Sequence, residues 1–177
     1  MKGNGKVLKG NHEHMLVDAH KKRYYYAPNI WTGNGAFLTL ESYGYSEMQN
    51  PMKVIPEDHI DFMDNLPLKF EIEADGKKAI VTHGTLHGNH TVEKCLNLGG
   101  GFYGNLFDPD SEHCILWNRT KPTKRDYFQI YGHNSRKSYE EHKGKGGKPY
   151  AVCIDTWKGG HLTALLWPEM VYFKEKM

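Results

Sequence analysis

The chain has 177 residues, a length that suits one domain of ordinary size. Its 23 Lys and Arg nearly balance 21 Asp and Glu, so charge gives no argument for nucleic acid or a membrane surface as a partner. No apolar stretch follows the N-terminal Met-Lys-Gly-Asn-Gly-Lys as a secretory signal requires, and no run has transmembrane length. Cys95, Cys114 and Cys153 form no C-x-x-C pair, so we expect reduced thiols in a cytoplasmic protein.

The first third of the chain predicts mainly helices. Lys21, Lys22 and Arg23 close one helical pattern, where the helix dipole favours cations. Pro56 opens another, because proline is tolerated in the first turn. The predicted elements of this part are a strand at 6–9, a helix at 12–23, loops with a short helix at 36–42 in the stretch 24–50, and a helix from 56 to 66.

The rest of the chain predicts mainly strands. Leu68, Phe70 and Ile72 alternate with charged residues, and Asp75-Gly76 is a hairpin signal. The predicted elements are strands at 68–73, 79–81, 127–131, 150–155 and 161–167, a short helix near 91–97, a loop at 143–148 and a short edge strand at 171–173. This order favours one α/β (α+β-like) domain over residues 1–177, with a layered sheet.

The stretch Gly10-Asn11-His12-Glu13 stands at a predicted strand-to-helix corner. One interpretation is local: Asn11 caps the helix, because its side-chain oxygen can accept a free backbone N–H. The other is that its amide and the next imidazole face one polar centre. His83 and His133 each end an apolar, strand-like run beside a glycine, so they are candidates for the same point. The other eight histidines are expected to be solvated or locally bonded.

These motifs, in this order, resemble the calcineurin-like metallophosphoesterases, and within them the bacterial and phage branch of the serine/threonine phosphoprotein phosphatases. The resemblance extends to the diadenosine-tetraphosphate hydrolases and covers nearly the whole chain. The matching pieces are Gly10-Asn11-His12-Glu13, Gly33-Asn34-Gly35, Ile55-Pro56, Leu66-Pro67-Leu68, Val81-Thr82-His83-Gly84, Trp117-Asn118-Arg119, Gly132-His133 and Ile154-Asp155-Thr156. It implies the C-terminal portion of a layered β-sandwich flanked by helices.

The resemblance also implies a role for each matching position. Asn11, His83 and His133 correspond to ligands of one metal of a two-metal site, with Mn²⁺ the expected ion. His12 corresponds to a histidine that protonates the leaving-group oxygen, and Arg119 to an arginine that grips the phosphate. These residue types suit that chemistry, since imidazoles titrate near neutral pH and a guanidinium fork matches phosphate oxygens.

Two further motifs of that family, Asp-x-His and Gly-Asp-x-x-Asp-Arg-Gly, occur nowhere in the 177 residues. The ligands that remain are one amide and two imidazoles, and we expect no acidic neighbour beside them. Hard cations favour oxygen donors, so we expect weak metal binding and weak or no hydrolysis by this chain alone. A complementary N-terminal chain is a possible partner, beside a phosphorylated protein or small phosphoester as substrate.

Two alternatives stay open at this point. The chain could be a non-catalytic remnant that serves as a binding or interaction module, or a dinucleoside-polyphosphate hydrolase. A third, plainer interpretation is that its histidines are structural.

Overall fold

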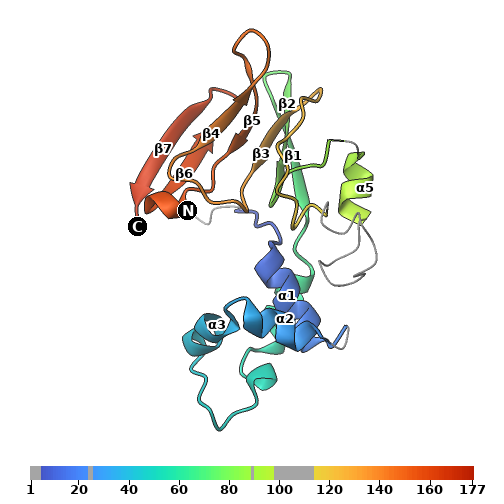
Figure 1. Cartoon of the computed structure of the whole chain (residues 1–177), viewed down its shortest axis with the longest axis vertical. Coiled ribbons are helices and arrows are strands. Elements are labelled where there is room, and N and C mark those ends of the chain that lie inside the picture. Colours follow the sequence, from blue (N-terminus) through green and yellow to red (C-terminus); the bar gives the residue numbers. More distant parts are fainter. Residues whose placement is uncertain (1–4, 24–25, 89, 98–113) are drawn as a thin grey trace.

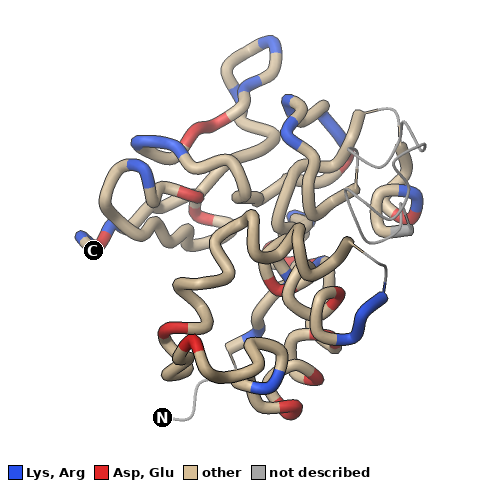
Figure 2. Tube along the Cα trace, turned by 60° about the horizontal axis from the view of Figure 1, so that its bottom comes forward, with Lys and Arg blue, Asp and Glu red and all other residues tan. Residues whose placement is uncertain are grey.

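The structure, a computed structural model, describes residues 5–23, 26–88, 90–97 and 114–177. A group of helices lies below the main sheet, which has five strands, and the N-terminal end of α1 points toward the lower edge of that sheet (Figure 1). Basic and acidic residues are interspersed over both the helices and the sheet (Figure 2). In the described part of the chain, no helix is long and apolar enough to cross a membrane. The glycine run at 99–101 lies outside the described residues.

The helical part contains α1 (Asn11–His20), α2 (Ala27–Gly33), α3 (Ala36–Ser42), a 3-10 turn (Pro51–Lys53) and α4 (Glu57–Asp64). The predicted helices at 36–42 and after Pro56 are confirmed, and α1 begins one residue before its predicted start. The loop predicted across 27–33 is wrong, because Ile30 and Trp31 of α2 are buried in the main core. The predicted strand at 6–9 is also wrong: these residues have no regular structure, although Lys9 N donates to the Pro67 carbonyl at 2.9 Å.

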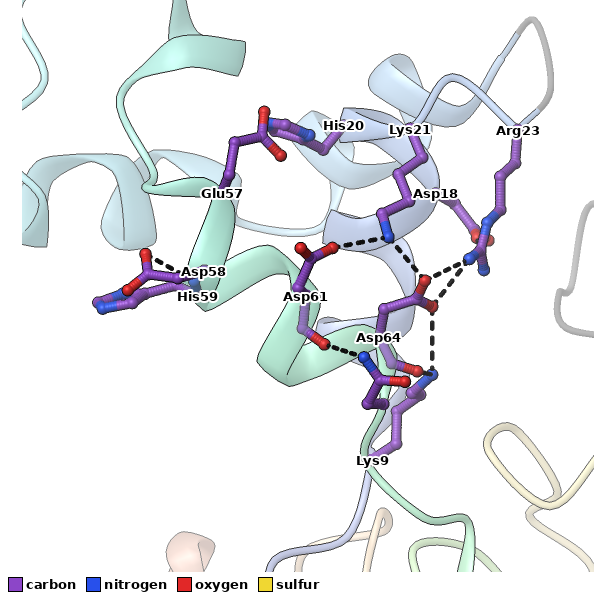
Figure 3. A network of polar contacts seen from close by, with 11 residues as sticks. Lys9, Asp18, His20, Lys21, Arg23, Glu57, Asp58, His59, Asp61 and Asp64 are labelled. Atoms are coloured by element: carbon purple, nitrogen blue, oxygen red, sulfur yellow. Dashed lines mark hydrogen bonds and ion pairs between the residues drawn. The ribbon is translucent and has the colours of Figure 1, made fainter.

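A polar network joins α1 and the residues after it to α4 (Figure 3). Asp64 accepts hydrogen bonds from Lys21 at 2.8 Å and from Arg23 at 2.7 and 2.8 Å, and Lys9 Nζ donates to the Asp64 carbonyl at 2.7 Å. Lys21, and then Arg23, lowers the pKa of Asp64 to about 2. The network therefore fixes the orientation of α1, and with it the Asn11 end of that helix, relative to α4.

The main sheet has the strand order β1-β2-β3-β5-β4. Its strands are β1 (Lys69–Ala74), β2 (Lys77–Thr82), β3 (Phe128–Tyr131), β4 (Glu140–Lys143) and β5 (Pro149–Cys153). β2, β3 and β5 are parallel, and each outer strand pairs antiparallel with its neighbour. Asp75 and Gly76 both have positive φ (50° and 68°), as the predicted hairpin turn requires.

β4 was not predicted from the sequence, because its residues, Glu-Glu-His-Lys, are polar. It is an edge strand, where charged side chains are common. Only His142 of β4 is buried, and the hydroxyl of Tyr131 on β3 lies 2.6 Å from its Nε2. The strand is therefore held by one inward-facing imidazole and by backbone pairing with β5.

A second, two-stranded sheet packs on one face of the main sheet. β6 (His161–Leu166) and β7 (Val171–Lys176) form an antiparallel hairpin, longer at β7 than predicted. Its inner residues Leu165 and Tyr172 contact Phe128, Ile130 and Val152 of the main sheet. Near the opposite face lies α5 (Val92–Asn97), at its predicted place, and its Cys95 belongs to the same main core as Ile80 of β2. The fold is thus mixed α/β, as predicted, and its assignment to the calcineurin-like sandwich stays a prediction.

Candidate functional site

Three polar side chains meet where strands β2 and β3 face the start of α1. His83 follows the end of β2, and His133 stands two residues beyond β3. Because these strands are parallel neighbours, their carboxyl ends lie at the same edge of the sheet. Gly132 N donates to the His83 carbonyl at 2.8 Å, which joins the two loops. Asn11, the first residue of α1, approaches the same edge.

The side-chain atoms of these residues lie within hydrogen-bond distance. His83 Nε2 is 2.9 Å from Asn11 Oδ1 and 3.1 Å from His133 Nδ1. The two imidazole centroids are 5.0 Å apart, with planes inclined by 59°. We call Asn11, His83 and His133 the amide–imidazole cluster. The helix-cap interpretation of Asn11 is wrong, because Gly10 is the N-cap residue and the Asn11 side chain faces His83.

Both imidazoles of the cluster are held in their neutral form. Burial lowers the pKa of His83, against the opposing charges of Glu13 and Asp155. Burial, and then the neighbouring His83 and Arg119, lowers the pKa of His133 to about 4. Both rings are therefore neutral at pH 7, the form in which an imidazole nitrogen can coordinate a cation.

His133 carries two further marks of a constrained position. Its backbone φ is +68°, a left-handed conformation that non-glycine residues seldom adopt and that is enriched at functional sites. Its Nε2 is buried without a hydrogen-bond partner. The Trp117 ring stands edge-on to the imidazole, with centroids 6.1 Å apart. The backbone conformation and the neighbouring Trp117 ring therefore limit where this imidazole can lie.

His12 and Arg119, the two predicted catalytic residues, have exposed side chains near the cluster. His12 follows Asn11 in the chain, and the charges of His12 and Arg119 both act on the pKa of His133. Arg119 follows the buried Asn118, whose Nδ2 donates to the Thr85 carbonyl at 2.9 Å. The three predicted ligands are therefore in contact, the charges of the two predicted catalytic residues reach His133, and the roles of all five stay predictions.

Two carboxylates act on the pKa values of the cluster from outside it. The Glu13 carboxylate accepts a hydrogen bond from Gly10 N at 2.8 Å, and its charge acts on His83. Asp155, just beyond β5, acts on both His83 and His133. Both carboxylates stand within the motifs of the resemblance, Gly-Asn-His-Glu and Ile-Asp-Thr. Their place in these motifs was therefore an available signal, but only the folded chain brings them to the imidazoles.

The donor atoms of the cluster are of kinds that divalent cations bind. Two ligands in cis positions around a metal at ~2.1 Å are separated by roughly 3.0 Å, close to the 2.9 and 3.1 Å observed. Among the described residues, no three His, Cys, Asp or Glu side chains are arranged to hold a metal ion. The candidate ligand set is therefore two imidazoles and an amide, with the carboxylates outside it.

The remaining described histidines have partners outside the cluster, some near in the sequence and some, such as His20 with Glu57 and His142 with Tyr131, on other elements. His14, for example, lies 3.1 Å from Asp18 one helical turn away, and Tyr43 bonds His59 at 2.7 Å. His113 lies outside the described residues. Two hollows of about 440 and 510 Å³ lie elsewhere, one beside β1, β2 and α5 and the other between residues 5–7 and α4, and neither is lined by a cluster residue.

Comparison of the chain with models of known protein families finds no match. Comparison with curated proteins finds none either.

Proposed function

We propose that the chain is a metal-dependent phosphoesterase that hydrolyses phosphate monoesters, in the manner of the serine/threonine phosphatase branch that its motifs resemble. One observation supports this function above the others. The amide oxygen of Asn11 lies 2.9 Å from His83 Nε2, and the Nδ1 of His133 lies 3.1 Å from the same nitrogen, although the three residues come from separate segments of the chain. Both imidazoles are neutral. Structural histidines bonded to near neighbours in sequence, such as His14 to Asp18, do not have this arrangement.

In this proposal Asn11, His83 and His133 hold a divalent cation, with Mn²⁺ the expected ion. When bound, the cation would polarise a phosphoryl oxygen and stabilise the charge that develops there. Arg119 binds other phosphate oxygens through its guanidinium, and its exposed position leaves it accessible to a substrate. His12 donates a proton to the departing alkoxide oxygen. A phosphorylated protein or a small phosphoester would fit these groups.

The test is hydrolysis of p-nitrophenyl phosphate with Mn²⁺, with and without a peptide that carries the two motifs absent from the 177 residues. We expect faster turnover with the peptide, since those motifs include acidic metal ligands. His12→Ala should then lower kcat by roughly 10²-fold or more, the usual contribution of general acid catalysis. The matched control is His20→Ala at the other end of α1, where the imidazole pairs with Glu57 at 3.5 Å. Equal losses from the two substitutions would contradict the role given to His12.

A further inference from the structure

A closed set of hydrogen bonds joins the residues on both sides of Arg119. The Thr85 hydroxyl, which has one hydrogen, donates to the Thr120 carbonyl at 2.9 Å and also lies 3.3 Å from the Asn118 carbonyl. Asn118 Nδ2 donates to the Thr85 carbonyl at 2.9 Å, and its Oδ1 accepts from Thr120 N at 3.1 Å. We call Thr85, Asn118 and Thr120 the polar ring. Through it, the residue before Arg119 and the residue after it both bond to Thr85.

The side chains that close the polar ring are shielded from water. Thr85 is 4% exposed and Asn118 is 1% exposed. Breaking a hydrogen bond between buried groups is costly, because water cannot replace the lost partner. The backbone on either side of Arg119 therefore resists displacement, whereas Arg119 itself is exposed.

The polar ring is joined to the loop that carries His83. Gly84, between His83 and Thr85, donates its N–H to the Ile115 carbonyl at 2.8 Å. A Cβ on Gly84 would lie 2.6 Å from that carbonyl oxygen and 3.1 Å from the carbonyl oxygen of Asn118. The loop after β2 can approach this closely because residue 84 has no side chain.

The segment before Arg119 also lies against the second imidazole of the cluster. The ring of Trp117 stands edge-on to that of His133, with centroids 6.1 Å apart. The backbone N–H groups of Trp117 and Asn118 both donate to the Cys114 carbonyl at 2.8 Å, so this segment is a tight turn. The turn that leads to Arg119 is thus in contact with His133 and bonded to the residues that follow His83.

We propose that Thr85 and Asn118 are positioning residues for Arg119: the polar ring fixes the backbone of Arg119 relative to His83, so that the guanidinium meets phosphate oxygens beside the amide–imidazole cluster. The inference rests on the phosphate-binding role of Arg119 in the proposed function. An arginine side chain has many rotamers, and ordering it for binding costs entropy. A fixed backbone limits where the guanidinium can reach, and paired bonds from a guanidinium to phosphate depend on that geometry.

The experiment is titration of the full chain with inorganic phosphate, followed by phosphorus NMR. Arg119→Ala should weaken phosphate binding roughly 10-fold or more, because hydrogen bonds to charged groups are the strong ones. Thr85→Val removes the hydroxyl that closes the polar ring and should weaken binding roughly 3-fold or more, as expected for residues coupled in one network. Thr85→Ser keeps the hydroxyl and should bind phosphate nearly as the wild type does.

Controls separate positioning from a general loss of structure. Thr32→Val on α2 removes a hydroxyl that donates to the Asn29 carbonyl at 3.0 Å, in the helical part, and should leave phosphate binding unchanged. Thermal unfolding of each variant shows whether it is folded at the temperature of the titration. If Thr85→Val is not folded there, Thr85→Ala takes its place, since it removes the hydroxyl without adding an apolar branch, and the same loss is expected.

The outcomes distinguish the two proposals. Weaker binding in Arg119→Ala together with wild-type binding in Thr85→Val would overturn the positioning inference and leave the role of Arg119 standing. Equal losses from Thr85→Val and Thr85→Ser would also overturn it, because the hydroxyl would then not be the cause. An absence of phosphate binding by the wild type, or an affinity that Arg119→Ala does not change, would overturn the role of Arg119, and the inference with it.

Discussion

Replacing Gly10 by alanine tests the close packing on which the site depends. The new methyl group would lie 2.7 Å from Glu13 Oε2 and 3.0 Å from His83 Cε1, while ordinary contacts begin at 3.4 Å. The Glu13 side chain can swing away, but it then loses its 2.8 Å bond to residue 10. The imidazole must move by a few tenths of an ångström, away from its 2.9 Å contact with Asn11.

Overpacking of this kind costs about 1–3 kcal/mol in the free energy of unfolding. For a chain of this size, each kcal/mol lowers Tm by roughly 2–4 °C. We expect both changes in urea and thermal unfolding followed by circular dichroism, together with weaker Mn²⁺ uptake. The control is Gly33→Ala at the end of α2, where an added Cβ meets nothing within 4 Å. That change should stabilise the chain by up to about 1 kcal/mol, because alanine favours a helix more than glycine does. Wild-type stability and Mn²⁺ affinity in Gly10→Ala would refute the reasoning.

Two further predictions concern the helical part. Lys21 and Arg23 lower the pKa of Asp64 from 3.8 to about 2, so the stabilisation from its ionised form is fully present above pH 4 and is lost as the pH falls through about 2. After allowance for solvent screening, Asp64→Asn should therefore lower the free energy of unfolding by roughly 1–2 kcal/mol at pH 7 and by almost nothing at pH 2. Urea unfolding at the two pH values measures both losses, and a loss that does not change with pH would contradict this. Ile60→Ala should lower the free energy of unfolding by about 2–5 kcal/mol in the same assay, because Ile60 is fully buried. Phe62→Ala, at an exposed position on the same helix, should change it by about 0.5 kcal/mol or less. Similar losses at both positions would show that burial does not control the loss of stability.

Local patterns in the sequence predicted the elements whose conformation depends on neighbouring residues. The Asp75-Gly76 turn is set by the positive φ that its two residues tolerate. The helix at 36–42 and the helix after Pro56 also follow from residues within a few positions. Where the pattern depends on distant packing, sequence reasoning was wrong or silent. α2 forms because Trp31 finds a buried place in the core, and β4 forms because His142 meets Tyr131.

The sequence by itself determined which groups are available for chemistry: an amide, three imidazoles and a guanidinium, each in a short motif at a predicted element end. Only the tertiary structure decided how they are arranged. The parallel pairing of β2 and β3 brings His83 and His133 together, and the docking of α1 adds Asn11. It also brings Glu13 and Asp155 near enough for their charges to act on the pKa of His83. The physical reason is that a motif specifies side chains within a few residues, whereas charge and distance at a site depend on segments that meet only when the chain folds.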